Sequence, residues 1–214
     1  MAKNPAKVTP DMNRSQLAND LKKYQEKALQ LGAREAKIIK TEEIPVEEAV
    51  VVKCRMPRCF GYGVSAHCPP HAPKPSEMKE YLKEFEWAIF FIRNVPTELL
   101  LRDRSDKERR DAFRSIYNIV SEIESMAFYD GHYLAFGLGA GGCRRTFCDP
   151  HESCQALEGE GCRFPVLARP SMEAVGINVY RMVASAGWDI FPIGKSLKAN
   201  DVPKATLAGI IIIQ

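Results

Sequence analysis

The sequence predicts an α/β fold, with a βαβ-rich mixed sheet, helices packed on it and two long cysteine-bearing loops at one edge. Two observations predict a sheet covered by helices. β-branched and apolar runs alternate with amphipathic stretches from residue 36 onwards. The runs 87–92 and 210–213 are continuously apolar, as in buried strands. A third, the confinement of all cysteines to two Gly- and Pro-rich stretches, predicts the loops. The 214 residues suffice for one core. We therefore expect a flexible tail over 1–12 and a single α/β domain over 13–214.

Four helices are expected. An apolar stripe predicts the first over 13–31, and Gly32 is a natural stop. Ser76 is a suitable cap for a short helix to residue 85. The pair Ser105 and Glu108 forms a capping-box pattern before a helix with one apolar side to residue 126. The last helix is expected from Ser171 to the stop at Gly187.

Five strands are expected from β-branched or continuously apolar runs. They cover residues 36–40, 46–53, 87–92, 132–138 and 207–213. The two cysteine-bearing loops each follow a predicted strand, at residues 53 and 138. Ligands bind at the carboxyl ends of strands in open α/β sheets, so parallel neighbouring strands would bring the two loops together.

Charge and hydropathy exclude several classes of protein. The net charge of +3 gives no electrostatic argument for binding nucleic acid. No stretch approaches the roughly 18 apolar residues of a membrane span. The first residues have no apolar core, so they are not a secretory signal. We therefore expect a cytoplasmic protein that has no nucleic-acid or membrane partner and whose thiols stay reduced.

The seven cysteines form two groups. The first cysteine segment, residues 54–75, carries three, and the second, residues 143–165, carries four. The candidate metal ligands are Cys54, Cys59 and Cys68 in the first segment and Cys143, Cys148, Cys154 and Cys162 in the second. The odd number and the reducing compartment disfavour disulfides, and no Cys-x-x-Cys redox pair is present. Metal binding is the hypothesis that remains.

Spacing favours iron–sulfur over zinc. Structural zinc sites usually use close cysteine pairs, whereas most spacings here are wider and irregular, which suits a larger cubane. Four cysteines saturate a [4Fe–4S] cluster, so the second set, Cys143, Cys148, Cys154 and Cys162, is the first choice as cofactor ligands. Three cysteines leave one position open, for His67 or His71, for a residue from elsewhere or for a substrate. His151 is a comparable candidate ligand.

Further residues beside the cysteines fit an anionic cluster. Pro69 and Pro70 follow Cys68, as proline follows cysteine in ferredoxin loops. Nearby guanidinium groups would offset the negative charge of the thiolates, or they are ordinary surface charges. These arginines are Arg55, Arg58, Arg144, Arg145 and Arg163. The glycines at 137–142 resemble a phosphate-cradling loop, but we expect a cysteine loop after them rather than a helix, which disfavours nucleotide binding.

The pattern resembles a family of prokaryotic predicted metal-binding proteins of iron–sulfur type, common in anaerobes, whose domain has no assigned function. The matching residues are Cys54-x4-Cys59, Tyr62-Gly-x-Ser-Ala-x-Cys68-Pro-Pro, Gly142-Cys143, Cys148, Cys154, Cys162-Arg-x-Pro and Ala168-Arg-Pro-Ser-Met-Glu-Ala-x-Gly176-Ile-Asn-Val. The resemblance implies a metal or iron–sulfur site at the seven cysteines and no particular reaction. Four residues separate Cys143 from Cys148, where the family usually has two. Arg169 begins the last motif and has a role either in docking the following helix or beside the cluster.

Three functions remain open. The leading hypothesis is a cytoplasmic protein with one or two [4Fe–4S] clusters that transfers electrons to or from a partner enzyme. The second is an enzyme that uses an open iron on a small substrate, in sulfur transfer or dehydration. The third is a zinc-stapled interaction module.

Overall fold

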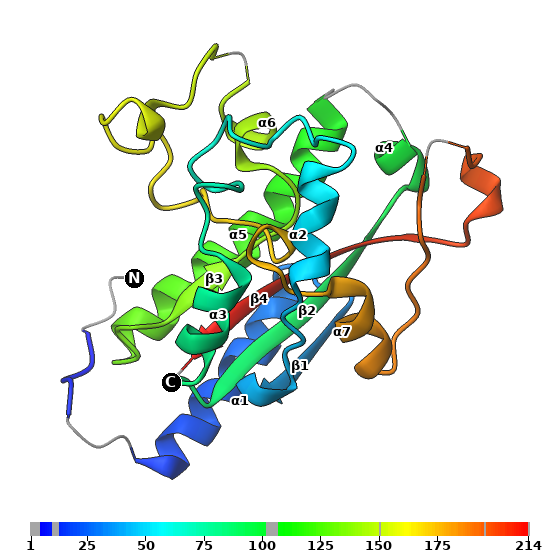
Figure 1. Ribbon diagram of the computed structural model, residues 1–214. Helices are drawn as coiled ribbons and strands as arrows, with labels where there is room; N and C mark the ends of the chain where they lie inside the picture. The colour runs from blue at the N-terminus through cyan, green and yellow to red at the C-terminus, as the bar shows by residue number, and fades with distance from the viewer. Residues whose placement is uncertain (1–4, 10–12, 102–106, 150, 195, 214) are drawn as a thin grey trace.

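The computed structural model describes residues 5–9, 13–101, 107–149, 151–194 and 196–213 (Figure 1). It confirms the α/β class, with helices packed on a sheet. The helices are α1 (Arg14–Gln30), α2 (Glu48–Arg55), α3 (Pro75–Leu82), α4 (Thr97–Leu101), α5 (Lys107–Tyr129), α6 (Cys143–Phe147) and α7 (Val179–Ser185). The strands are β1 (Glu35–Lys40), β2 (Trp87–Val95), β3 (Phe136–Leu138) and β4 (Ala205–Ile213). Within the described residues no helix has the length and apolar character needed to cross a membrane.

The sheet has the order β1-β2-β4-β3, and all three pairs of neighbouring strands are antiparallel. The βαβ arrangement with parallel strands was therefore wrong. Alternation along the chain does not fix strand direction: the long connection 41–86 begins and ends at one end of the sheet, where Lys40 pairs with Trp87. Parallel neighbouring strands therefore do not bring the two cysteine segments together.

Helices cover both faces of the sheet. Ile89 and Phe91 of β2 pack with α1 and α5 on one face, and Phe90 and Ile92 pack with α3 and α7 on the other. Alternate residues of a strand point to opposite faces, so an apolar run such as 87–92 is what two covered faces require. β4 is buried along nearly its whole length for the same reason.

The predicted strand 46–53 is instead the helix α2. Only Val46 makes a β-bridge, with Ile177, and the helix begins at Glu48. No sheet strand pairs with this segment, and Val51 is the only buried residue of α2. A helix places Val51 and Cys54, three residues apart, on one face. The β-branched residues of this segment did not distinguish a helix from a strand.

The predicted helix from Ser171 to Gly187 is interrupted. A short 3-10 turn, Glu173–Val175, ends at Gly176, which has a φ of 91°. The side chain of Asn178 then caps α7 by accepting a hydrogen bond from the Arg181 amide. A Cβ at Gly176 would lie 2.7 Å from Pro75, so the glycine allows both the positive φ and the close approach.

The other expected elements hold with smaller differences. α1, α3, α5, β1, β2 and β4 lie where helices and strands were predicted. β3 begins only at Phe136, because the predicted strand from His132 starts with a turn in which the Ala135 amide donates to His132. Ser105 of the expected capping box lies outside the described residues, as does much of the expected tail over 1–12.

Three glycines let the main chain in and after β3 lie against α5. A Cβ at Gly137, Gly139 or Gly141 would come within 2.1, 2.5 or 2.6 Å of the side chains of Val120, Tyr117 or Phe113, respectively. The glycine motif therefore serves close packing against a helix. Contrary to the expectation, a short helix, α6, does begin directly after it, at Cys143.

Candidate metal centres

The first set of thiols lies at the end of α2 and in the turns after it. Cys54 is in the last turn of the helix, and the Cys59 amide donates to its carbonyl oxygen at 3.0 Å. The Cys68 amide donates to the Ser65 carbonyl at 3.1 Å. Local turns thus fix the cysteine backbones, and all seven cysteines of the chain are free.

Gly61 leaves space beside two of these sulfurs. A Cβ at this position would lie 3.2 Å from Cys68 Sγ and 3.9 Å from Cys59 Sγ. Any larger residue would occupy the space between the thiols. This hollow, next to two thiols, is what a metal centre held by the first set needs.

The second set surrounds a small cavity. Cys143 begins α6 and Cys148 caps its C-terminal end, and both line the cavity together with Cys154 and Cys162. The Phe164 amide donates to Cys162 Sγ at 3.4 Å, a contact that would also stabilise a thiolate there. Four thiols suit a soft metal or an iron–sulfur cluster. The cavity volume is only about 10 Å³, so a cluster would require the side chains to move outwards.

Two of the arginines singled out from the sequence hold the backbone of the second segment. Arg144 Nη2 donates to the carbonyl oxygens of His151 and Glu152. Arg163 Nη1 donates to the Ser153 carbonyl at 2.8 Å. These contacts hold the backbone over residues 151–153 in place.

The two cysteine segments contact each other. Cys143 Sγ lies 3.3 Å from Ser65 Oγ and 3.5 Å from His67 Nδ1. The guanidinium of Arg145 lies over the ring of Phe60, 3.2 Å from its centroid. Figure 1 shows both segments at the same end of the molecule, where α2 extends towards α6. The helix that replaced the predicted strand thus carries the first segment to the second.

Burial keeps several thiols protonated. It raises the pKa of Cys68 to about 11 and that of Cys143 to about 12, and neighbouring cysteines from both segments add to each rise. The pKa values of Cys54 and Cys148 are also raised, mainly by burial. A raised pKa disfavours the thiolate that a catalytic cysteine needs, whereas a bound metal ion would itself lower the pKa of the thiols that ligate it.

The three histidines considered as candidate ligands have different surroundings. His67 lies beside Cys143, and burial lowers its pKa, with a smaller effect from Arg169. His71 and His151 are exposed. Among the described residues no group of three His, Cys, Asp or Glu side chains has the arrangement that holds a single metal ion. Whether the seven cysteines are ligands stays a prediction.

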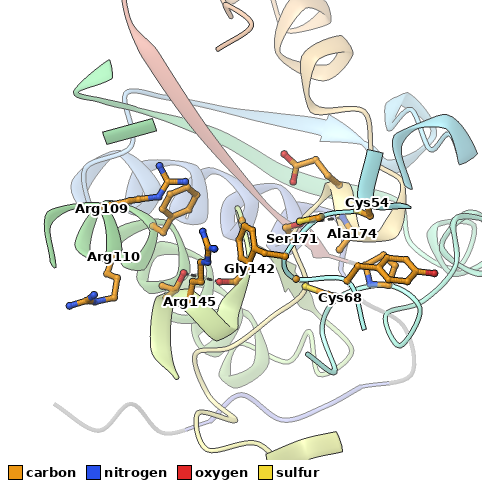
Figure 2. A pocket seen from close by; sticks show the side chains of 17 residues that line it. Cys54, Cys68, Arg109, Arg110, Gly142, Arg145, Ser171 and Ala174 are labelled. Atoms are coloured by element: carbon orange, nitrogen blue, oxygen red, sulfur yellow. Dashed lines mark hydrogen bonds between the residues drawn. The ribbon is translucent and has the colours of Figure 1, made fainter. Parts of the chain in front are cut away.

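A pocket of about 250 Å³ opens beside the first set. Cys54, Cys59 and Cys68 all line it. Figure 2 shows Arg109, Arg110 and Arg145 on one side of the pocket and Cys54 and Cys68 on the other, with Gly142 between them. The remaining lining residues include Phe60, Tyr62, Pro69, Phe113, Ser171, Glu173 and Ala174.

Sequence reasoning identified Arg145 beside a cysteine but missed the contribution of α5. Arg109, Arg110 and Phe113 lie some 30 residues before the second segment, and they reach the pocket only because the glycine-rich chain lies against α5. The glycine spacing over 137–141 was the one available signal, since glycines at alternate positions of a strand indicate close approach of another element.

Arg169 has the docking role. Its Nη2 and Nε lie 2.5 and 3.0 Å from the two carboxylate oxygens of Glu124 on α5. Glu124 Oε2 also accepts a hydrogen bond from the Gly137 amide at 2.7 Å. The pair therefore joins α5, β3 and the segment before the 3-10 turn, and Arg169 is not among the residues lining either cysteine cavity.

Comparison with known proteins gives one match. The model of a family described as predicted metal-binding protein (DUF2284) matches residues 37–213, a range that includes all seven cysteines. No curated protein and no solved structure matches the chain.

Proposed function

The chain belongs to the family of predicted metal-binding proteins (DUF2284), and from that premise we propose that it is a cytoplasmic iron–sulfur protein that exchanges electrons with a partner protein. The second set of cysteines would hold one [4Fe–4S] cluster and the first set another. A cluster held by cysteine thiolates accepts and donates single electrons at a potential that burial, charge and hydrogen bonds set.

One observation carries this proposal. The seven free thiols divide between two cavities, and the two sets are joined by the contacts of Ser65 and His67 with Cys143. Two neighbouring centres suit transfer of electrons from one to the other. Ser65 and the Phe164 amide are positioned to donate to Cys143 and Cys162, which would stabilise thiolates in a buried site.

The pocket supports a second candidate function. The first set supplies three thiols beside a pocket of about 250 Å³, whereas the second set supplies four around a small cavity. A centre with three protein ligands has a position for a substrate, and the pocket gives a small molecule access to it. This favours an enzyme acting on a small molecule, by sulfur transfer or dehydration, over a zinc-stapled interaction module.

Metal and sulfide analysis tests the proposal. Protein purified without oxygen is expected to be brown and to contain about eight iron and eight sulfide per chain, the content of two cubanes. Cys54→Ala and Cys162→Ala should each lose about half of the iron, because each removes a ligand of a different cluster. Ser153→Ala, next to Cys154, is the matched control and should keep all of it.

Two results would contradict the proposal. Stoichiometric zinc without sulfide would favour the interaction module. A cluster that dithionite does not reduce and ferricyanide does not reversibly oxidise would exclude the electron-transfer role while leaving the second candidate function open.

A further inference from the structure

We propose that the exposed side chains around Cys54 and Cys59 form a docking surface for an acidic electron-transfer protein. The surface lies at the end of the molecule that carries both cysteine segments (Figure 1). Its members are Lys53, Arg55, Met56, Arg58 and Phe60. This inference rests on the proposed function, because it names the chemistry of the partner and the centre at which that partner exchanges electrons.

The charge of the docking surface has one sign. Residues 49–76 contain four Lys or Arg and no Asp or Glu. Lys53, Arg55 and Arg58 are exposed, and within the described residues none of the three forms an ion pair with an acidic side chain. Arg58 lies over the ring of Tyr62, 5.5 Å from its centroid. Cations without an acidic neighbour attract a partner whose own surface carries carboxylates.

Apolar side chains are exposed among these cations. Met56 is 68% exposed and Phe60 is 51% exposed, and Val52 and Val64 are exposed in the same stretch of chain. Protein interfaces are enriched in Met, aromatic residues and Arg, with apolar groups at the centre and polar groups at the rim. Cations that only offset the charge of a cluster would not require exposed apolar neighbours. The mixture is therefore typical of a surface that another protein covers.

The docking surface surrounds candidate ligands of the first centre. Cys54 lies between Lys53 and Arg55 in the chain, and Cys59 follows Arg58 directly. All three cysteines of the first set are partly exposed, whereas two of the second set are buried. A partner that covers the docking surface therefore comes close to the first centre. Electron transfer between proteins needs such a short distance between the two centres.

The loop of the second cysteine segment presents the opposite charge. Every charged residue over 149–160 is acidic and exposed, namely Asp149, Glu152, Glu158 and Glu160. The nearby Arg144 and Arg163 donate to main-chain carbonyl oxygens of this loop. An acidic partner is repelled by this loop and attracted by the docking surface, so its contact is directed to the first centre.

Binding measurements with acidic and basic redox proteins test the inference. A plant-type ferredoxin and a flavodoxin are acidic one-electron carriers, and cytochrome c is a basic one. In calorimetric titration of protein purified without oxygen, both acidic carriers are expected to bind and cytochrome c is not. The affinity of the acidic carriers should fall as salt rises from about 50 to about 200 mM, because salt screens charge pairs between exposed groups.

Matched variants locate the docking surface. Lys53→Glu and Arg58→Glu should each weaken binding of the acidic carriers by about fivefold or more, because each replaces an attraction by a repulsion. Lys22→Glu, the same change at an exposed lysine of α1, should not. Met56→Ala should weaken binding at every salt concentration and leave the salt dependence unchanged, because it removes apolar contact without removing charge.

Three results would overturn the inference. The first is that neither acidic carrier binds, or that both charge reversals leave their affinity unchanged. The second is that cytochrome c binds as tightly as the acidic carriers. The third is a dimer of the natural chain that Met56→Ala dissociates in sedimentation experiments, because a second copy would then cover the surface.

Failure of this inference and failure of the proposed function can be told apart. Clusters that are reduced and reoxidised reversibly, in a protein that binds neither acidic carrier, would leave the proposed function standing without this surface. Binding that depends on Lys53 and Arg58, in a protein whose metal is not redox-active, would keep the docking surface and refute the exchange of electrons.

Discussion

Gly61 matters through the side chain that it lacks. A methyl group there would lie 3.2 Å from Cys68 Sγ, so Gly61→Ala is expected to reduce the metal held by the first set by half or more and to leave the second set loaded. Metal content per chain, measured by mass spectrometry, checks this. Gly194→Ala is the control, because a Cβ there meets nothing within 4 Å and its φ is not positive. Full metal content in Gly61→Ala would contradict the assignment of the first set.

His132 makes folding sensitive to acid. It is fully buried, its Nε2 lies 3.4 Å from Asp20, and its Nδ1 has no hydrogen-bond partner among the described residues. Burial lowers its pKa, while Asp20 and Asp130 partly offset this and Lys23 adds to it; Tyr24 is the other polar neighbour, in edge-on contact with the His132 ring. The unfolded chain takes up a proton near pH 6.5, before the folded protein does.

The free energy of unfolding should therefore be highest above about pH 6.5 and should fall as the pH drops below it. Urea unfolding at pH 7.5, 6.5 and 5.5 measures this slope. His132→Gln should be less stable at pH 7.5 and should have a shallower slope, whereas exposed His71→Gln should keep the slope of the natural protein. An unchanged slope in His132→Gln would show that other groups cause the acid sensitivity.

At the scale of the elements, the Arg169–Glu124 pair joins three parts of the fold. Glu124→Ala would leave a half-buried guanidinium and the Gly137 amide without their acceptor. We expect a loss of about 2 kcal/mol in the free energy of unfolding, measured by urea denaturation. The exposed pair Lys83 and Glu80 is the comparison, and Lys83→Ala should cost less than about 0.5 kcal/mol. Equal losses would mean that the Glu124 contacts do not join these elements.

The elements show which local signals were decisive. The periodic stripes of α1 and α5 and the apolar runs of β2 and β4 were sufficient, because each of these elements packs against the core along most of its length. The segment 46–53 was misassigned because a run of valines has the same composition in a strand as in a short helix with one buried residue. The break at Gly176 depends on contact with Pro75, which no local pattern contains.

The candidate site was partly predictable, because only some of its residues belong to a local sequence pattern. The clustering of the cysteines makes all seven candidate ligands from the sequence alone, and their role as ligands stays a prediction. The arginine side of the pocket could not be predicted, because Arg109 and Phe113 join it through the packing of α5 on a distant glycine-rich chain. The direction of the strands could not be predicted either, because it depends on the end of the sheet at which a long connection such as 41–86 comes back.

At the scale of the whole molecule, metal binding and local order should be linked. Both cysteine segments lie outside the sheet, and they contact each other through Cys143, Ser65 and His67. Ligation energy is partly folding energy in such loops. Removing the metal with a chelator should therefore increase amide hydrogen exchange over residues 56–72 and 143–165 and leave β2 and β4 unchanged. Uniform exchange before and after removal would contradict a structural role for the metal.

The close packing of Gly137, Gly139 and Gly141 on α5 also limits how the pocket can be remodelled. Main-chain atoms, rather than exchangeable side chains, set the spacing between α5 and the strand leading to Cys143. Substituting smaller residues along this contact would therefore not make the pocket large enough for a bulkier compound. Room has to be made on another wall, at the side chains of Phe60 and Tyr62.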